Sequence, residues 1–196
     1  MASKKESNFF NMVSTLLVIS IVASISLGAV YNLTKGPIDL AKQKKQEEAI
    51  RNVLPEFDRI ETIRVKANDL ADSLQFNMAY KQDEFVGVAI NTFTNKGFSG
   101  NIKIMVGLRP DGTIHNTSVL EHKETPGLGD KMQQSKSDWS LQFNGKNPES
   151  FILKVKKDGG SIDAITAATI SSRAFADAVQ RAFLTYESNK GGTENE

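Results

Sequence analysis

The longest apolar stretch of the sequence lies close to its N-terminus. Residues 7–34 carry no charged side chain, and the run Met12–Val30 is long enough to cross a bilayer, which needs about 20 residues. The run exceeds the apolar core of about 7–15 residues that is typical of a cleaved signal peptide, and no clear A-x-A site follows it. We therefore expect a short tail over residues 1–8 and an uncleaved transmembrane helix over residues 9–34.

A weaker helical pattern follows the apolar run. Apolar side chains recur at helical spacing over Ile38–Leu54, and Pro55 ends the pattern. The Gly36-Pro37 pair predicts a break before this helix, because proline lacks the backbone N–H that a helix interior needs. We assign residues 35–58 to a connecting helical segment.

The middle of the chain alternates between apolar and polar side chains with the period of a β-strand. The predicted strands are residues 60–65, 76–80, 85–94, 101–109, 113–121 and 152–155. The clearest is 101–109, whose even-numbered residues from 102 to 108 are apolar and share one face. Pro110-Asp111-Gly112 predicts a hairpin turn after it, and a short helix is expected at residues 130–134.

The last apolar pattern has helical spacing and lies on one face of a predicted C-terminal helix. Its members are Ala174, Phe175, Ala178, Val179, Ala182, Phe183 and Tyr186. We expect the helix to begin near Thr166 and a disordered polar tail to follow over residues 188–196. The fold class is therefore α+β: one transmembrane helix, then a domain of antiparallel sheet packed with helices, over residues 59–187.

Composition narrows the possible chemistry. The chain has no cysteine, which excludes disulfides and thiolate metal sites, and its formal net charge of +1 does not suggest a nucleic-acid partner. His115 and His122 fall on opposite faces of a predicted strand and do not form a metal pair. Trp139 and Phe143 are interpreted as core residues. We expect no metal site and no residue that acts as acid or base on a substrate.

Four hydroxyl side chains gather at the start of the C-terminal helix, in the sequence Asp163-Ala-Ile-Thr-Ala-Ala-Thr-Ile-Ser-Ser172. They allow two interpretations. Thr166 or Asp163 caps the helix, which is worth about 1 kcal/mol. Alternatively, the cluster binds a phosphate, because a helix start presents free N–H groups and the positive end of the dipole. The pattern alone favours the cap.

The same ten residues resemble the D-x-x-(S/T)-G-A-T-x-(S/T)-S signal of membrane-linked flavoproteins, and six of the seven specified positions match. In those proteins a dedicated flavin transferase esterifies the phosphate of FMN onto the second threonine, which is Thr169 in this sequence. Ala167 departs from the pattern, since the family usually carries glycine there. An alanine at this position suits the expected first turn of the helix.

A second stretch narrows the resemblance. Gly97-Phe-Ser-Gly100 precedes one predicted strand, and Glu121-His-Lys-Glu-Thr-Pro-Gly-Leu-Gly129 follows the next. Together with the C-terminal signal, these stretches are similar to the G subunit of the Rnf ion-translocating electron-transport complex. The C subunit of the sodium-translocating NADH:quinone reductase represents a related family. The resemblance extends over most of residues 10–187.

This resemblance implies a membrane flavoprotein that carries covalent FMN and relays electrons in a complex that moves ions. The implied partners are the other membrane subunits, the lipid bilayer and, during maturation, the flavin transferase. The cofactor-binding residues that it implies are Thr169 as the acceptor, with Thr166, Ala168, Ser171 and Ser172 beside it, and Glu124, Thr125, Gly127 and Leu128 in a loop against the flavin ring. A flavin-free membrane-anchored assembly module is the alternative, and Ala167 favours it.

Membrane orientation is a point on which charge and resemblance disagree. Two lysines precede the anchor, whereas five basic residues follow it: Lys35, Lys42, Lys44, Lys45 and Arg51. The positive-inside rule alone puts the large domain in the cytoplasm, but the rule weakens for long domains. The resemblance implies a single-pass protein of the bacterial inner membrane with its domain on the periplasmic side, and we adopt that expectation.

Overall fold

The computed structural model describes residues 8–66 and 73–190. The chain divides into two compact units, residues 1–44 and residues 45–196. The predicted tails fall largely outside the described residues, which exclude 1–7 and 191–196.

Helix α1 spans Phe9–Val53; its residues up to Lys44 lie in the first unit, and the rest belong to the second. Within the described residues it is the one helix that is long and apolar enough to cross a membrane, and none of its most apolar window is buried by protein. The predicted break at Gly36-Pro37 is wrong, because α1 runs through Pro37. The proline leaves the carbonyl of Leu33 without its helical N–H donor, a local loss that the helix tolerates here.

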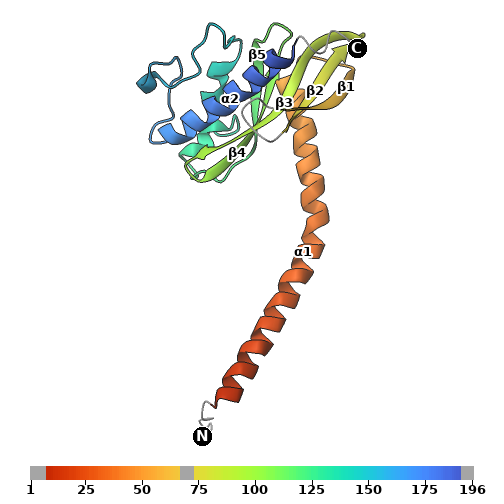
Figure 1. Ribbon diagram of the computed structural model, residues 1–196, viewed down its shortest axis with the longest axis vertical. Coiled ribbons are helices and arrows are strands. Elements are labelled where there is room, and N and C mark those ends of the chain that lie inside the picture. The colour runs from red at the N-terminus through yellow and green to blue at the C-terminus, as the bar shows by residue number, and fades with distance from the viewer. Residues whose placement is uncertain (1–7, 67–72, 191–196) are drawn as a thin grey trace. The chain divides into compact units, whose positions relative to one another are not determined.

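The second unit is built on a five-stranded antiparallel sheet in which every strand pairs with its neighbour in sequence (Figure 1). The strands are β1 Arg59–Lys66, β2 Ser73–Lys81, β3 Glu84–Gly97, β4 Gly100–Leu108 and β5 Ile114–Glu121. The predicted turn at Asp111-Gly112 joins β4 to β5, and Asp111 accepts a hydrogen bond from the N–H of Thr113 at 2.9 Å. The α+β prediction is confirmed.

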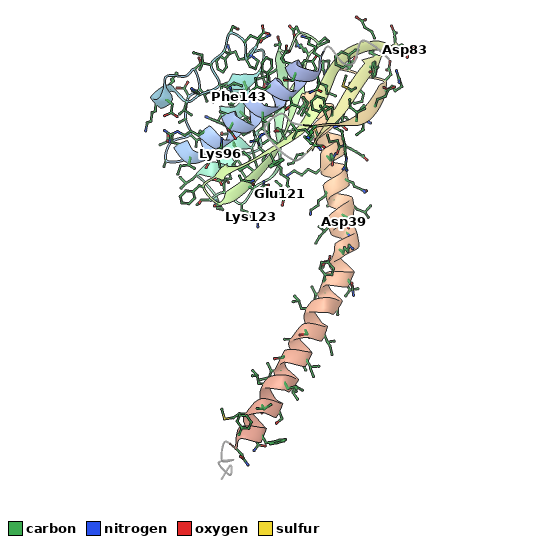
Figure 2. All side chains as sticks on the ribbon, in the orientation of Figure 1. Asp39, Asp83, Lys96, Glu121, Lys123 and Phe143 are labelled. Carbon is green, nitrogen blue, oxygen red and sulfur yellow. The ribbon has the colours of Figure 1, made fainter. Side chains whose placement is uncertain are left out.

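Helix α2, Thr169–Asn189, covers one face of the sheet (Figure 1). All seven residues of its predicted apolar face are buried, and so are the even-numbered residues 102 to 108 of β4 that they meet. Three aromatic rings pack together in this core, Phe175 of the helix with Trp139 and Phe143 (labelled in Figure 2), with centroids 5.1–5.5 Å apart. Burial of these apolar surfaces is the main force that holds α2 on the sheet.

The opposite face of the sheet packs against the last turns of α1. Ala49, Ile50 and Val53 form a second, smaller core with the odd-numbered strand residues Ala79 and Met105 and with their neighbours. The approach is closest at Gly107, where a Cβ would lie 1.7 Å from the carbonyl oxygen of Val53. Only glycine therefore fits at this position, and the sheet is covered by a helix on each face.

One predicted strand is absent from the structure, and the predicted C-terminal helix has different ends. Residues 152–155 do not form a strand; Val155 makes one isolated bridge to Ile162 in a loop. Helix α2 begins at Thr169 rather than near Thr166, and it extends to Asn189, into the predicted tail. Both differences concern short segments, where tertiary contacts outweigh local propensity.

Candidate functional site

A pocket of about 320 Å³ opens where three separate segments meet. The segments are the turn between β3 and β4, the loop after β5 and the start of α2. The lining residues are Phe98, Glu124, Thr125, Leu128, Gly129, Ala167, Ala168, Thr169, Ile170 and Ser171. The pocket thus joins the two stretches on which the sequence resemblance rests, and its size lies at the lower end of small-molecule sites.

The start of α2 presents free backbone donors to this pocket. Ala168 is the N-cap residue and makes no side-chain capping bond, so the predicted cap by Thr166 or Asp163 is wrong. The first backbone bond of the helix runs from the N–H of Ser172 to the carbonyl of Ala168 at 3.0 Å. The N–H groups of residues 169–171 have no backbone acceptor in the described structure. Unpaired donors at the positive end of a helix dipole bind anions, and phosphate above all.

Ala167 has a left-handed backbone, with φ of 62°. It therefore does not lie in a helical turn, and the expectation that alanine suits this position is wrong. L-residues with a Cβ pay roughly 1–2 kcal/mol in this region, whereas glycine adopts it freely. The glycine that the flavoprotein signal carries here thus has a physical reason, and this chain reaches the same turn at a conformational cost.

Glu124 is a buried carboxylate in the wall of the pocket, with 5% of its surface exposed. Its Oε1 accepts the N–H of Ser99 at 2.9 Å, and its Oε2 accepts the hydroxyl of Ser171. Glu124 therefore links the β3–β4 turn, the loop after β5 and helix α2, which are the three segments that form the pocket.

Thr169 is half-buried, and its hydroxyl makes no hydrogen bond among the described residues. The position of this threonine is set from both sides. On the buried side, the hydroxyl of Ser172 accepts the N–H of Ile165 at 2.9 Å and donates to the carbonyl of Ala168 at 3.0 Å. Thr169 thus starts a helix whose first turn is held by contacts that do not involve its own side chain.

On the exposed side, an ion pair fastens the first turn of α2. Arg173 donates two hydrogen bonds to Asp158, from Nε at 2.7 Å and from a terminal nitrogen at 2.8 Å. These hydrogen bonds from Arg173 hold the pKa of the Asp158 carboxyl below its usual value, although the group is exposed to solvent. A bidentate pair of this kind fixes geometry more than it adds stability.

The structure brings together most, but not all, of the residues that the sequence resemblance implies. Glu124, Thr125, Leu128, Ala168, Thr169 and Ser171 line the pocket. Thr166 is exposed and Gly127 borders open space, and neither lines it; Ser172 is fully buried below it.

Four pocket residues were not predicted as site residues: Phe98, Gly129, Ala167 and Ile170. Phe98 and Ile170 are apolar and exposed, at 67% and 46% of their surface. Phe98 and Gly129 belong to the two stretches that carry the resemblance. The aromatic Phe98 between Gly97 and Gly100 could therefore have been predicted as a site residue from the sequence. Nothing in the local sequence marks Ile170.

The residues present fit an FMN group. Free N–H groups and an unengaged hydroxyl suit its phosphate, and the apolar side chains of Phe98, Leu128 and Ile170 suit its ring system. No cluster of three or more histidine or acidic side chains in the described part of the chain could hold a metal ion. Fold and pocket together define a membrane-anchored protein with a flavin-type site in its folded domain.

Comparison with known proteins leads from this class to a family. The profile of the family described as "FMN-binding domain" matches residues 97–183, which contain all three segments of the pocket. The chain is 37% identical to the G subunit of the ion-translocating oxidoreductase complex of Erwinia tasmaniensis, over 89% of this chain and 90% of the relative. It is 35% identical to the protein of the same name from Shewanella piezotolerans, over 92% of each chain. The corresponding protein of Vibrio atlanticus is 36% identical, over 85% of this chain and 86% of the relative.

The chain belongs to the family formed by the G subunits of ion-translocating oxidoreductase complexes. The predicted resemblance to this family is confirmed, and so is the class of function: a membrane flavoprotein of an electron-transfer complex.

Proposed function

We propose that Thr169 carries FMN as a covalent phosphoester and that the chain, in this form, relays electrons within an ion-translocating membrane complex. The observation that carries the proposal is the position of the Thr169 hydroxyl. It lines the pocket at a helix start, has no hydrogen-bond partner among the described residues, and lies beside the free N–H groups of residues 169–171. A phosphate esterified there meets donors that are already in place.

The attachment is a substitution at phosphorus, in which one P–O bond forms and another breaks. The oxygen of the Thr169 hydroxyl attacks the phosphorus of an activated flavin in which the FMN phosphate is joined to a second phosphate as an anhydride. The anhydride P–O bond breaks, the second phosphate leaves with the bonding electrons, and the hydroxyl proton is released; a flavin transferase catalyses this step. After attachment the flavin supplies the electron chemistry, and the protein fixes its position and excludes water. In this proposal no side chain of the chain acts on a substrate. The flavin exchanges electrons with the other membrane subunits.

We place the folded domain on the periplasmic side of the bacterial inner membrane. A covalent tether suits that side, because flavin lost there is not replaced from the cytoplasmic pool. The five basic residues after the anchor argue for the opposite orientation. Reporter fusions after Glu196 decide between the two: a periplasm-active reporter supports the proposal, and activity of a reporter that works only in the cytoplasm contradicts it.

The test of attachment is the intact mass of the protein made with and without the flavin transferase. With the transferase, the expected gain is the mass of one FMN less one water. Thr169→Val should abolish this gain, whereas the matched change Thr62→Val should retain it, because Thr62 is exposed in β1 and lies outside both the pocket and the flavoprotein signal. A wild-type chain without added mass would favour the flavin-free assembly module. A Thr169→Val protein that still gains the mass would show that another residue is the acceptor.

A further inference from the structure

Both side-chain oxygens of the buried residue Glu124 accept hydrogen bonds, one from the N–H of Ser99 and one from the hydroxyl of Ser171. The N–H of Ser99 can only donate and the hydroxyl of Ser171 is able to donate, so both contacts suit an ionised carboxylate, which accepts on both oxygens. Glu124 therefore brings a negative charge into a pocket that is suited to an anionic cofactor.

Two glycines confine this carboxylate. A Cβ on Gly97 would lie 2.9 Å from Oε1 of Glu124, and a Cβ on Gly129 would lie 2.8 Å from Oε2 and 2.7 Å from the Cβ of Glu124. The backbone thus approaches the carboxylate from the β3–β4 turn and from its own loop. A side chain on either glycine would displace the carboxylate or the main chain.

Among residues 8–66 and 73–190, no lysine or arginine forms an ion pair with Glu124. Its compensation comes from two neutral hydrogen-bond donors and from the positive end of α2, to which Ser171 belongs. The two hydrogen bonds and the helix dipole reduce the free-energy cost of burying the carboxylate. They do not cancel its negative charge, which stays in the wall of the pocket.

The same geometry changes the role of Ser171. Its hydroxyl is committed to Glu124, so the phosphate on Thr169 is left to the backbone N–H groups of the first turn. The flavin and the carboxylate therefore share one helix terminus through different donors.

We infer that Glu124 is a positioning residue whose fixed negative charge lowers the midpoint potential of the flavin; the inference rests on the proposed attachment at Thr169. Each electron that enters the flavin without a proton adds one negative charge to the pocket. A fixed charge of the same sign opposes that addition, and burial strengthens the effect because screening by water is weak. An electron followed by a proton leaves no added charge and is not opposed.

Glu124→Gln tests the inference, because it removes the charge while keeping size and the ability to bond Ser99 and Ser171. Glu121→Gln is the matched control: Glu121 (labelled in Figure 2) ends β5, is half-exposed and pairs with Lys103 at 2.8 Å. Glu124→Asp keeps the charge and serves as the rescue variant. Each full-length protein is flavinylated by the transferase, its loading is measured by intact mass, and its midpoint potential is measured by spectroelectrochemical titration with mediators.

The expected result is a higher midpoint potential for Glu124→Gln alone, with Glu121→Gln and Glu124→Asp close to wild type. Loading and thermal unfolding of Glu124→Gln should stay near wild type. Equal potentials for Glu124→Gln and Glu121→Gln would overturn the inference while leaving attachment intact. A Glu124→Gln protein that takes up no flavin would also overturn it, since the charge would then serve attachment. Absence of flavin in wild type would instead refute the proposed function.

Discussion

Gly129 lies so close to Ser171 that a Cβ on the glycine would come within 2.7 Å of the serine hydroxyl oxygen. The two residues belong to the loop after β5 and to helix α2, and their contact closes one side of the pocket. Only a glycine hydrogen fits between the loop and the helix at position 129. A larger side chain there would have to displace either the loop or the start of α2.

Gly129→Ala should therefore disturb the pocket and destabilise the domain by about 1–3 kcal/mol, the usual cost of overpacking. Gly127→Ala is the control. Gly127 has φ of 77° but borders open space, so it should lose only about 1–2 kcal/mol of backbone energy and keep the pocket intact. Thermal unfolding and the extent of flavinylation, measured on both variants, test this. Equal loading by the two would argue against a role for the close contact.

Ala167→Gly should stabilise the protein by about 0.5–1 kcal/mol. Glycine relieves the left-handed conformation at φ of 62°, which outweighs the larger entropy it gives the unfolded chain. Ala164→Gly, three residues earlier and not at positive φ, should lower stability by a similar amount. Urea unfolding of the two variants beside wild type measures the difference, and a destabilised Ala167→Gly protein would show that the strain is not real.

Phe98 and Leu128 are expected to shield the flavin ring from water, because both are apolar, both line the pocket and both present exposed surface to it, at 67% and 39%. Phe98→Ala and Leu128→Ala should each leave covalent flavin in place and make it more accessible to a soluble fluorescence quencher. Leu141→Ala is a control at an equally exposed leucine, 43%, outside the pocket. If flavin fluorescence in both pocket variants is quenched to the same extent as in wild type, Phe98 and Leu128 do not shield the flavin.

Asp177 should contribute stability that depends on pH. Burial alone would raise the pKa of its carboxyl, but hydrogen bonds from Lys96 at 2.6 Å and Thr94 at 2.7 Å, with the nearby charges, lower it below the ordinary 3.8. The stabilisation is therefore complete above that value and is lost as pH falls through the lower pKa of the folded state. Asp177→Asn should lose about 1 kcal/mol near neutral pH and progressively less below pH 3.8.

Thermal unfolding of wild type and Asp177→Asn between acidic and neutral pH measures this loss. Asp83→Asn is the control, because the Asp83 side chain is 94% exposed (labelled in Figure 2). A constant difference between wild type and Asp177→Asn over the acidic range would contradict the linkage.

Much of the fold could be predicted because its elements have strong periodic patterns. Spacing alone predicts that the even-numbered residues of β4 and the apolar face of α2 belong to the core, and both are buried. The failures lie where pattern is weak. Pro37 predicts a helix break, yet α1 continues through it, because a single lost hydrogen bond is outweighed by the helix on both sides.

The sequence by itself predicted the apolar N-terminal helix, the strands of the antiparallel sheet and Thr169 as the expected acceptor, since these predictions depend on hydropathy, alternation and a local motif. Only the tertiary structure decided how the start of α2 is used. Ala167 adopts a left-handed turn and Ser171 bonds Glu124, 47 positions away. Neither feature can be predicted from the neighbouring residues. The positive φ of Ala167 and the hydrogen bond between Ser171 and Glu124 arise only when the sheet brings the loop after β5 against the helix.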